Sequence, residues 1–150
     1  MGNFPTGVTV ITGESESGHV HGMTANSFTS VSLDPLLILV CVDHNAKLLS
    51  YLQTRRRFAV NILKHTQQAL SEYFAKPSDE PGEEARLGIR YRWTPSGIPL
   101  LENALAQLAC KVVSEHVAGD HTIFIGQVEG MELGEGEPLV YHRGKYRCLE

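Results

Sequence analysis

The sequence predicts a mainly β fold, organised as a small antiparallel, Greek-key-like barrel with a few helices. Short stretches rich in β-branched and apolar residues recur along the 150-residue chain, as expected of strands. Gly, Pro, Asn and Asp residues separate these stretches and indicate turns. Helical spacing of apolar residues is confined to short segments, and the chain contains no internal repeat. Together these observations favour an antiparallel barrel.

Length, composition and charge restrict the possible functions. A chain of 150 residues with 42% hydrophobic and 20% charged residues predicts one globular domain over residues 1–150. The net charge is -4 and the only basic run is Arg55–Arg57, so no nucleic-acid partner is expected. No apolar segment reaches membrane-spanning length, and the N-terminus lacks a signal-peptide pattern. We therefore expect no membrane partner either.

The cysteines and histidines do not predict a metal site. Cys41, Cys110 and Cys148 are far apart and lack the CxxC spacing of zinc sites. Cys41 and Cys110 lie in apolar strand-like runs and are expected to be buried thiols, which suits a reducing cytoplasm. His19 and His21 would share one face of a strand. With no carboxylate or cysteine nearby, a polar strand face is the preferred interpretation over a metal site.

The first third of the chain contains the most informative strands. VTVIT, residues 8–12, is β-branched, and Met23–Ser32 is predicted to form one continuous strand that ends at an Asp-Pro turn. Leu36–Asp43 is almost entirely apolar, which is typical of a strand buried on both faces. The hydroxyl and amide side chains between Thr24 and Ser32 would let a ligand approach the backbone closely. By composition alone, a hydroxyl-rich strand without a ligand is the preferred interpretation.

Two helices and a long loop are expected in the middle. Residues 45–54 have leucines at helical spacing with Asn45 as N-cap, and residues 66–75 have a similar apolar face with Thr66 as cap. A strand, FAVNIL at residues 58–63, lies between them. Residues 76–87 are charged and contain Pro and Gly, which predicts an exposed loop or lid with one helical turn.

The last third returns to strands. Short strands are expected at residues 91–93, 139–141 and 145–149, and longer strands at residues 104–116 and 122–131. The chain has no GxGxxG after a strand, which argues against a Rossmann dinucleotide site. It also has no Walker, GxSxG or HExxH motif.

Six segments in order carry a resemblance to a known family: FPTGVTVIT (Phe4–Thr12), GMTANSFTSVSLDP (Gly22–Pro35), LILVCVD (Leu37–Asp43), FAVNIL (Phe58–Leu63), GDHTIFIGQV (Gly119–Val128) and PLVYHRGKYR (Pro138–Arg147). The chain resembles the flavin reductase-like family, the reductase components of two-component monooxygenases. The resemblance covers nearly the whole chain, and the combination of GMTANSFTSVSLDP with GDH and YHRGKY is specific.

The resemblance implies a fold, an activity and partners. The fold would be the FMN-binding split barrel, and the activity would be reduction of FMN or FAD by NADH or NADPH, with reduced flavin supplied to a partner monooxygenase. A homodimer with flavin near its interface is also implied. The alternatives are a flavin- or haem-related binding protein on the same barrel without reductase turnover, and a structural or interaction barrel that binds no flavin.

The resemblance also implies site residues. The first flavin segment maps onto Met23, Thr24, Ala25, Asn26 and Ser27, and the second onto Asp43, His44, Asn45 and Lys47. The nicotinamide side maps onto His121, taken as the catalytic residue, and onto His142, Arg143, Gly144 and Tyr146. Lys47 is equally well interpreted as a phosphate ligand or as a solvated residue of the first helical turn. Arg143 and Gly144 can be interpreted either as a pyrophosphate-binding pair or simply as the turn residues of a hairpin.

The chain departs from the family pattern in two places. Ala46 and Leu48 stand where many relatives carry small hydroxyl residues, which shifts the expected phosphate contact to Lys47, Ser50 or the backbone. The family also has a helix before its FPTGV-like stretch, and here the sequence begins almost at that stretch. A short or missing N-terminal helix is therefore expected.

Overall fold

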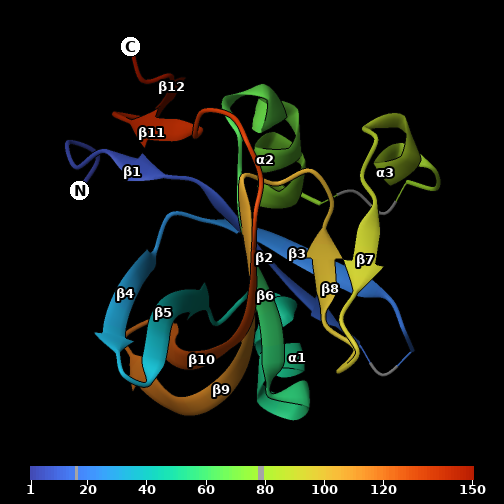
Figure 1. The fold of residues 1–150 in the computed structure, drawn as a ribbon, viewed down its shortest axis with the longest axis vertical. Coiled ribbons are helices and arrows are strands. Elements are labelled where there is room, and N and C mark those ends of the chain that lie inside the picture. The colour runs from blue at the N-terminus through green and yellow to red at the C-terminus, as the bar shows by residue number, and fades with distance from the viewer. Residues whose placement is uncertain (16, 78–79) are drawn as a thin grey trace.

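The computed structural model describes residues 1–15, 17–77 and 80–150 (Figure 1). Its strands are β1 (Thr6–Gly7), β2 (Thr9–Glu14), β3 (Val20–Ala25), β4 (Phe28–Leu33), β5 (Leu36–Asp43), β6 (Arg57–Ile62), β7 (Tyr91–Trp93), β8 (Pro99–Leu101), β9 (Ala106–Ala118), β10 (His121–Leu133), β11 (Val140–His142) and β12 (Lys145–Arg147). Its helices are α1 (Leu48–Arg55), the 3₁₀ turn η1 (His65–Gln67), α2 (Gln68–Ala75) and α3 (Glu83–Arg86).

Seven strands form the main sheet in the order β3-β2-β6-β9-β10-β5-β4, and every neighbouring pair is antiparallel. The two edge strands, β3 and β4, follow one another in the chain with only Asn26 and Ser27 between them. The sheet must therefore curl to bring its two ends together (Figure 1). The predicted mainly β, antiparallel barrel with a few helices is confirmed.

The prediction of one strand over Met23–Ser32 is wrong. The segment divides into β3 and β4, which pair with β2 and β5 respectively at opposite ends of the sheet order. The chain leaves one edge of the sheet after Ala25 and joins the opposite edge at Phe28. Residues on both sides of this break favour strands, so local propensity gave no sign of it.

One face of β5 is buried in the barrel. Ile38, Val40 and Val42 are almost fully buried and pack with Phe58 and Phe124 in the main core. The alternate residues of β5 are only half-buried. Burial on both faces, and with it a fully buried Cys41 thiol, is therefore wrong for the single chain, whereas Cys110 is fully buried.

The helices begin later than the sequence predicts. The N-cap of α1 is Lys47, with no side-chain hydrogen bond, and not Asn45. The reason is local: the Asp43 carboxylate accepts the backbone N–H of Asn45 at 2.7 Å, which fixes a turn before the helix. The cap predicted at Thr66 is also wrong: Thr66 lies inside the 3₁₀ turn η1, whose N-cap is Lys64, and the N-cap of α2 is Gln67. The helical turn expected in the lid-like segment is α3, although residues 78 and 79 of that segment lie outside the described residues.

Two small sheets complete the fold. Strands β1, β11 and β12 form one, and β7 and β8 form the other. In Figure 1 the first of these lies beside α2, above the barrel. Within the described ranges, no helix is long and apolar enough to cross a membrane.

Candidate flavin and nicotinamide site

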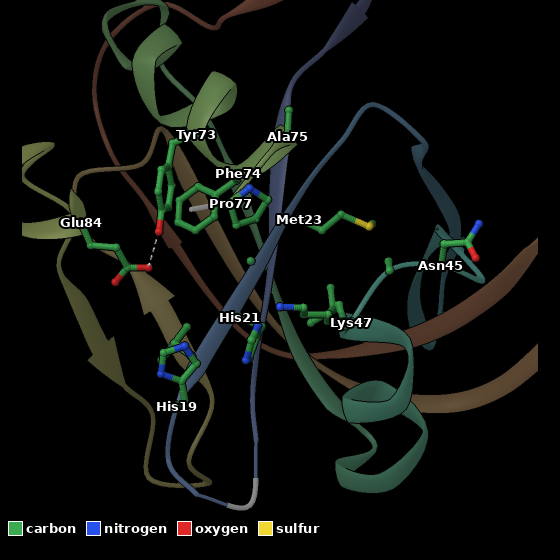
Figure 2. Close-up of a pocket in the computed structure, with 14 residues that line it drawn as sticks. His19, His21, Met23, Asn45, Lys47, Tyr73, Phe74, Ala75, Pro77 and Glu84 are labelled. Carbon is green, nitrogen blue, oxygen red and sulfur yellow. Dashed lines mark hydrogen bonds between the residues drawn. The ribbon is translucent and has the colours of Figure 1, made fainter. Parts of the chain in front are cut away.

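Strand β3 borders two neighbouring cavities. The first, of about 270 Å³, lies between β3, the turn before α1, and the end of α2 (Figure 2). The second, of about 200 Å³, lies between the end of β3, α2 and the β11–β12 hairpin. Ala75 lines both cavities. Because β3 is an edge strand, its outer side presents backbone N–H and C=O groups that no strand partner uses.

Gly22 lets α2 pack closely against β3. A Cβ atom at this position would lie 2.5 Å from two ring carbons of Phe74, and Phe74 is itself 2% exposed. Both residues line the first cavity. The glycine of the GMTANS segment therefore fixes the position of the cavity wall.

The hydroxyl groups of the GMTANS segment are already used as donors. Thr24 Oγ1 donates to the Ser71 carbonyl at 2.7 Å, and Ser27 Oγ donates to the Cys41 carbonyl at 3.1 Å. A hydroxyl has one proton, so each can only accept from a ligand. Asn26 is exposed at the rim of the second cavity, and its amide can donate. Ala25 is buried, and its carbonyl accepts from Thr9 Oγ1 at 2.7 Å.

The turn between β5 and α1 borders the opposite wall of the first cavity. Asn45, Ala46, Lys47 and Leu48 all line it. Figure 2 shows the Lys47 side chain extended towards β3, between His21 and Met23. The first turn of α1 has no acidic residue and no side-chain cap, so its amides and its positive dipole end suit an anion.

The GDH segment forms a separate cluster at the start of β10. Nδ1 of His121 lies 2.7 Å from Oδ1 of Asp120. Because a carboxylate can only accept, Nδ1 carries the proton. This hydrogen bond, with the attraction of the imidazole, holds the pKa of the Asp120 carboxyl below its usual range.

His121 is the strand partner of Asp43, and Nε2 of His44 lies 3.1 Å from the hydroxyl of the buried Thr122. The cluster thus adjoins the turn that leads to Lys47.

The YHRGKY segment is the β11–β12 hairpin. Arg143 and Gly144 have φ values of 52° and 73°, the left-handed conformation that a tight hairpin turn requires. The Arg143 side chain donates from Nε to the Asn3 side-chain carbonyl at 2.8 Å. Tyr146 packs on Tyr141 with ring centroids 5.4 Å apart, and its hydroxyl is 2.8 Å from Ser71 Oγ. The hairpin is therefore tied to α2 beside Thr24.

The structure brings together only some of the predicted site residues. Met23, Asn45 and Lys47 line the first cavity, and Thr24, Ala25, Asn26 and Tyr146 line the second. The remaining seven line neither of these two cavities: Ser27, Asp43, His44, His121, His142, Arg143 and Gly144. Asp43, His44 and His121 form the GDH cluster, and His142–Gly144 form the hairpin turn.

Sequence reasoning missed several residues of the cavity walls. His19, His21, Tyr73, Phe74 and Glu84 line the first cavity. The spacing of His19 and His21 was visible in the sequence but was interpreted as a polar strand face. Tyr73 and Phe74 were interpreted as part of the apolar face of a helix. Glu84 had no sequence signal; its Oε1 accepts from Tyr73 at 3.4 Å and Tyr91 at 3.2 Å, which ties α3 to α2 and β7 (Figure 2).

Comparison with known proteins identifies the family to which this fold belongs. A family described as "Flavin reductase like domain" matches residues 1–150. An NADH-dependent flavin reductase from Rhodococcus sp is 43% identical over 100% of this chain and 83% of the relative. The reductase component of 4-hydroxyphenylacetate 3-monooxygenase from Thermus thermophilus is 39% identical over 99% of this chain and 92% of its own length.

The solved structure of the flavin reductase PheA2 in its native state superposes with a TM-score of 0.90 at 46% identity, covering 100% of this chain and 94% of that one. The chain belongs to the flavin reductase like family. The resemblance inferred from the six sequence segments and the split-barrel fold that it implied are thereby confirmed.

Proposed function

We propose that this protein is an NADH-dependent flavin reductase that transfers a hydride from NADH to FMN or FAD and supplies reduced flavin to a partner monooxygenase. The observation that supports this most directly is the double cavity along β3, which is lined by the family's GMTANS segment. The chemistry belongs to the cofactors: NADH gives up the hydride and the flavin ring accepts it. The residues of the chain bind both molecules and orient them.

The flavin ring fits along the edge of β3. We assign its binding to Met23, Thr24, Ala25, Asn26 and Ser27. Because the Thr24 and Ser27 hydroxyl protons go to carbonyl groups, the donors to the ring's polar edge are the backbone N–H groups of the edge strand and the Asn26 amide. Such fixed donors stabilise negative charge that develops on a reduced ring.

The flavin phosphate fits at the start of α1. The uncapped helix end and the Lys47 ammonium supply positive charge to one wall of the first cavity. Asn45 lines the same wall, and Asp43 and His44 shape the turn that leads there. These groups replace the small hydroxyl side chains that Ala46 and Leu48 lack.

The nicotinamide side is assigned to two segments. We propose that His121 orients the nicotinamide or moves a proton, with its ring held by the Asp120 carboxylate. His142, Arg143, Gly144 and Tyr146 would contact the rest of NADH. The guanidinium of Arg143 suits a pyrophosphate, and Gly144 allows close approach of the backbone.

We also propose that the protein is a cytoplasmic homodimer. The outer face of β5 and β10, here called the β5–β10 face, consists of Leu37, Leu39, Cys41, Ile123 and Ile125, which are apolar and only half-buried. A second copy covering this face would bury both sides of β5 and account for its continuous apolar sequence.

The test is NADH oxidation by the purified protein, followed by NADH absorbance, with and without added FMN or FAD and with NADPH in parallel. We expect oxidation that depends on added flavin and is faster with NADH. His121→Ala should slow it by about 10²-fold or more if the imidazole takes part in proton transfer. A protein that binds flavin but oxidises neither nucleotide would be a flavin-binding barrel and not a reductase.

A further inference from the structure

The first cavity extends past the proposed phosphate site. One wall runs from Met23 back through His21 on β3 to His19, just before the strand begins, and Lys47 faces this wall near the middle (Figure 2). At about 3.3 Å per residue, the path from Met23 to His19 spans about 13 Å. A flavin mononucleotide ends at its phosphate, so it would leave the His19 end of the cavity without an occupant.

We propose that the His19 end of this cavity binds the adenosine of FAD and makes the protein prefer FAD over FMN. The inference rests on the proposed function, because it takes the flavin ring and phosphate to lie where that function places them. It concerns the part of the ligand that lies beyond the phosphate at Lys47.

A chain of ring contacts holds the His19 imidazole in place. The rings of His19 and His21 lie edge to face, with centroids 4.6 Å apart, and the ring of His21 lies 4.7 Å from that of Tyr51. His21 is on β3 and Tyr51 is on α1, so these two elements position the His21 ring against which His19 packs. His19 is exposed, which leaves a ring face accessible to a base. Stacking of a nucleobase on such a ring is sequence-tolerant and strong.

A carboxylate in the same cavity suits a ribose. Glu84 lines this cavity together with His19, and Figure 2 shows it on the side away from Asn45. Its two tyrosine hydrogen bonds both go to Oε1, and a carboxylate has about four lone-pair sites. Carboxylates commonly accept ribose hydroxyls in dinucleotide sites. A stacking surface and a hydroxyl acceptor thus line the same cavity, as an adenosine site requires.

The experiment is calorimetric titration of the protein with FMN, FAD and ADP, the last being FAD without its riboflavin. We expect the wild-type protein to bind FAD more tightly than FMN, and to bind ADP weakly. His19→Ala should weaken FAD binding about tenfold, the loss expected for one stacked base, and leave FMN binding unchanged. His65→Ala, the same change at an exposed histidine on η1, is the matched control.

The outcomes separate the inference from the proposed function. Equal wild-type affinities for FMN and FAD, or an unchanged FAD-to-FMN affinity ratio in His19→Ala, would overturn the adenosine site while flavin reduction still held. Equal weakening of FMN and FAD would also overturn it, because His19 would then act on the shared part of the ligand. Absence of flavin-dependent NADH oxidation would overturn the proposed function, whatever the affinity ratio.

Discussion

At the scale of single residues, the most specific contact of the candidate site is the Asp120–His121 pair. The hydrogen bond at 2.7 Å is made by a carboxylate that is almost fully exposed. Water therefore screens the interaction, and its contribution to the free energy of unfolding is small. The hydrogen bond therefore orients the ring: the imidazole keeps its proton on Nδ1, and Nε2 is left as the acceptor nitrogen.

We predict that the Asp120 carboxyl titrates below the usual aspartate pKa of about 3.9, because its folded-state pKa is lowered by the hydrogen bond from His121. Since the folded pKa is lowered, the stabilisation is present above the unfolded pKa and is lost as the pH falls through the folded one. NMR detection of the carboxyl carbon measures this midpoint. His121→Ala should return it towards the ordinary value, and an unchanged midpoint would show that the two side chains do not interact in solution.

At the scale of elements, the packing of α2 on β3 depends on one glycine. We predict that Gly22→Ala destabilises the protein by about 1–3 kcal/mol, the usual cost of overpacking, because the added methyl would lie 2.5 Å from the buried Phe74 ring. It should also weaken flavin binding, since both residues line the first cavity. Denaturant unfolding measures the first effect and flavin titration the second.

Gly7→Ala is the matched control for this substitution. Gly7 also lies in a strand, has no positive φ, and its Cβ would meet no atom within 4 Å. It should change the free energy of unfolding by less than about 1 kcal/mol. If both variants were equally stable, α2 would be free to move away from β3, and Gly22 would not fix the cavity wall.

How much the sequence predicts also differs from element to element. The apolar run from Leu36 gave the strand β5 with its correct bounds, because composition and turn signals agree there. The break at Asn26 depends on closure of the sheet, which is a long-range property. The start of α1 was missed because Asp43, and not Asn45, supplies the local side-chain contact.

In the candidate site, too, the sequence predicts local features but not long-range contacts. The GMTANS segment was found from the sequence because its residues are contiguous. Thr24 of this segment bonds to Ser71, 47 positions further along the chain, and Ser71 in turn bonds to Tyr146, a further 75 positions along. No local pattern reveals such pairs, so the sequence could not predict that the Thr24 hydroxyl would already be used as a donor.

At the scale of the whole molecule, the single chain leaves the β5–β10 face incompletely covered. Cross-strand pairs Leu39–Ile125 and Cys41–Ile123 lie side by side on it, while their neighbours Val40, Val42 and Phe124 fill the barrel core. Apolar residues on both sides of a strand are typical of strands with both faces covered. An interface of standard size buries about 800 Å² per partner, and a continuous apolar sheet face can contribute to such an interface.

We predict that Leu39→Lys converts a dimer into a monomer, because the substitution places a charge at the centre of the apolar β5–β10 face, where a partner would desolvate it. Light scattering coupled to size-exclusion chromatography should give twice the 16.5 kDa chain mass for the wild type and once for the variant. The barrel core is untouched because Leu39 points outward, so circular dichroism should be unchanged. Leu133→Lys, at the 76% exposed end of β10, is the control and should stay dimeric. A monomeric wild type would refute the dimer, and a dimeric Leu39→Lys would place its interface on another face.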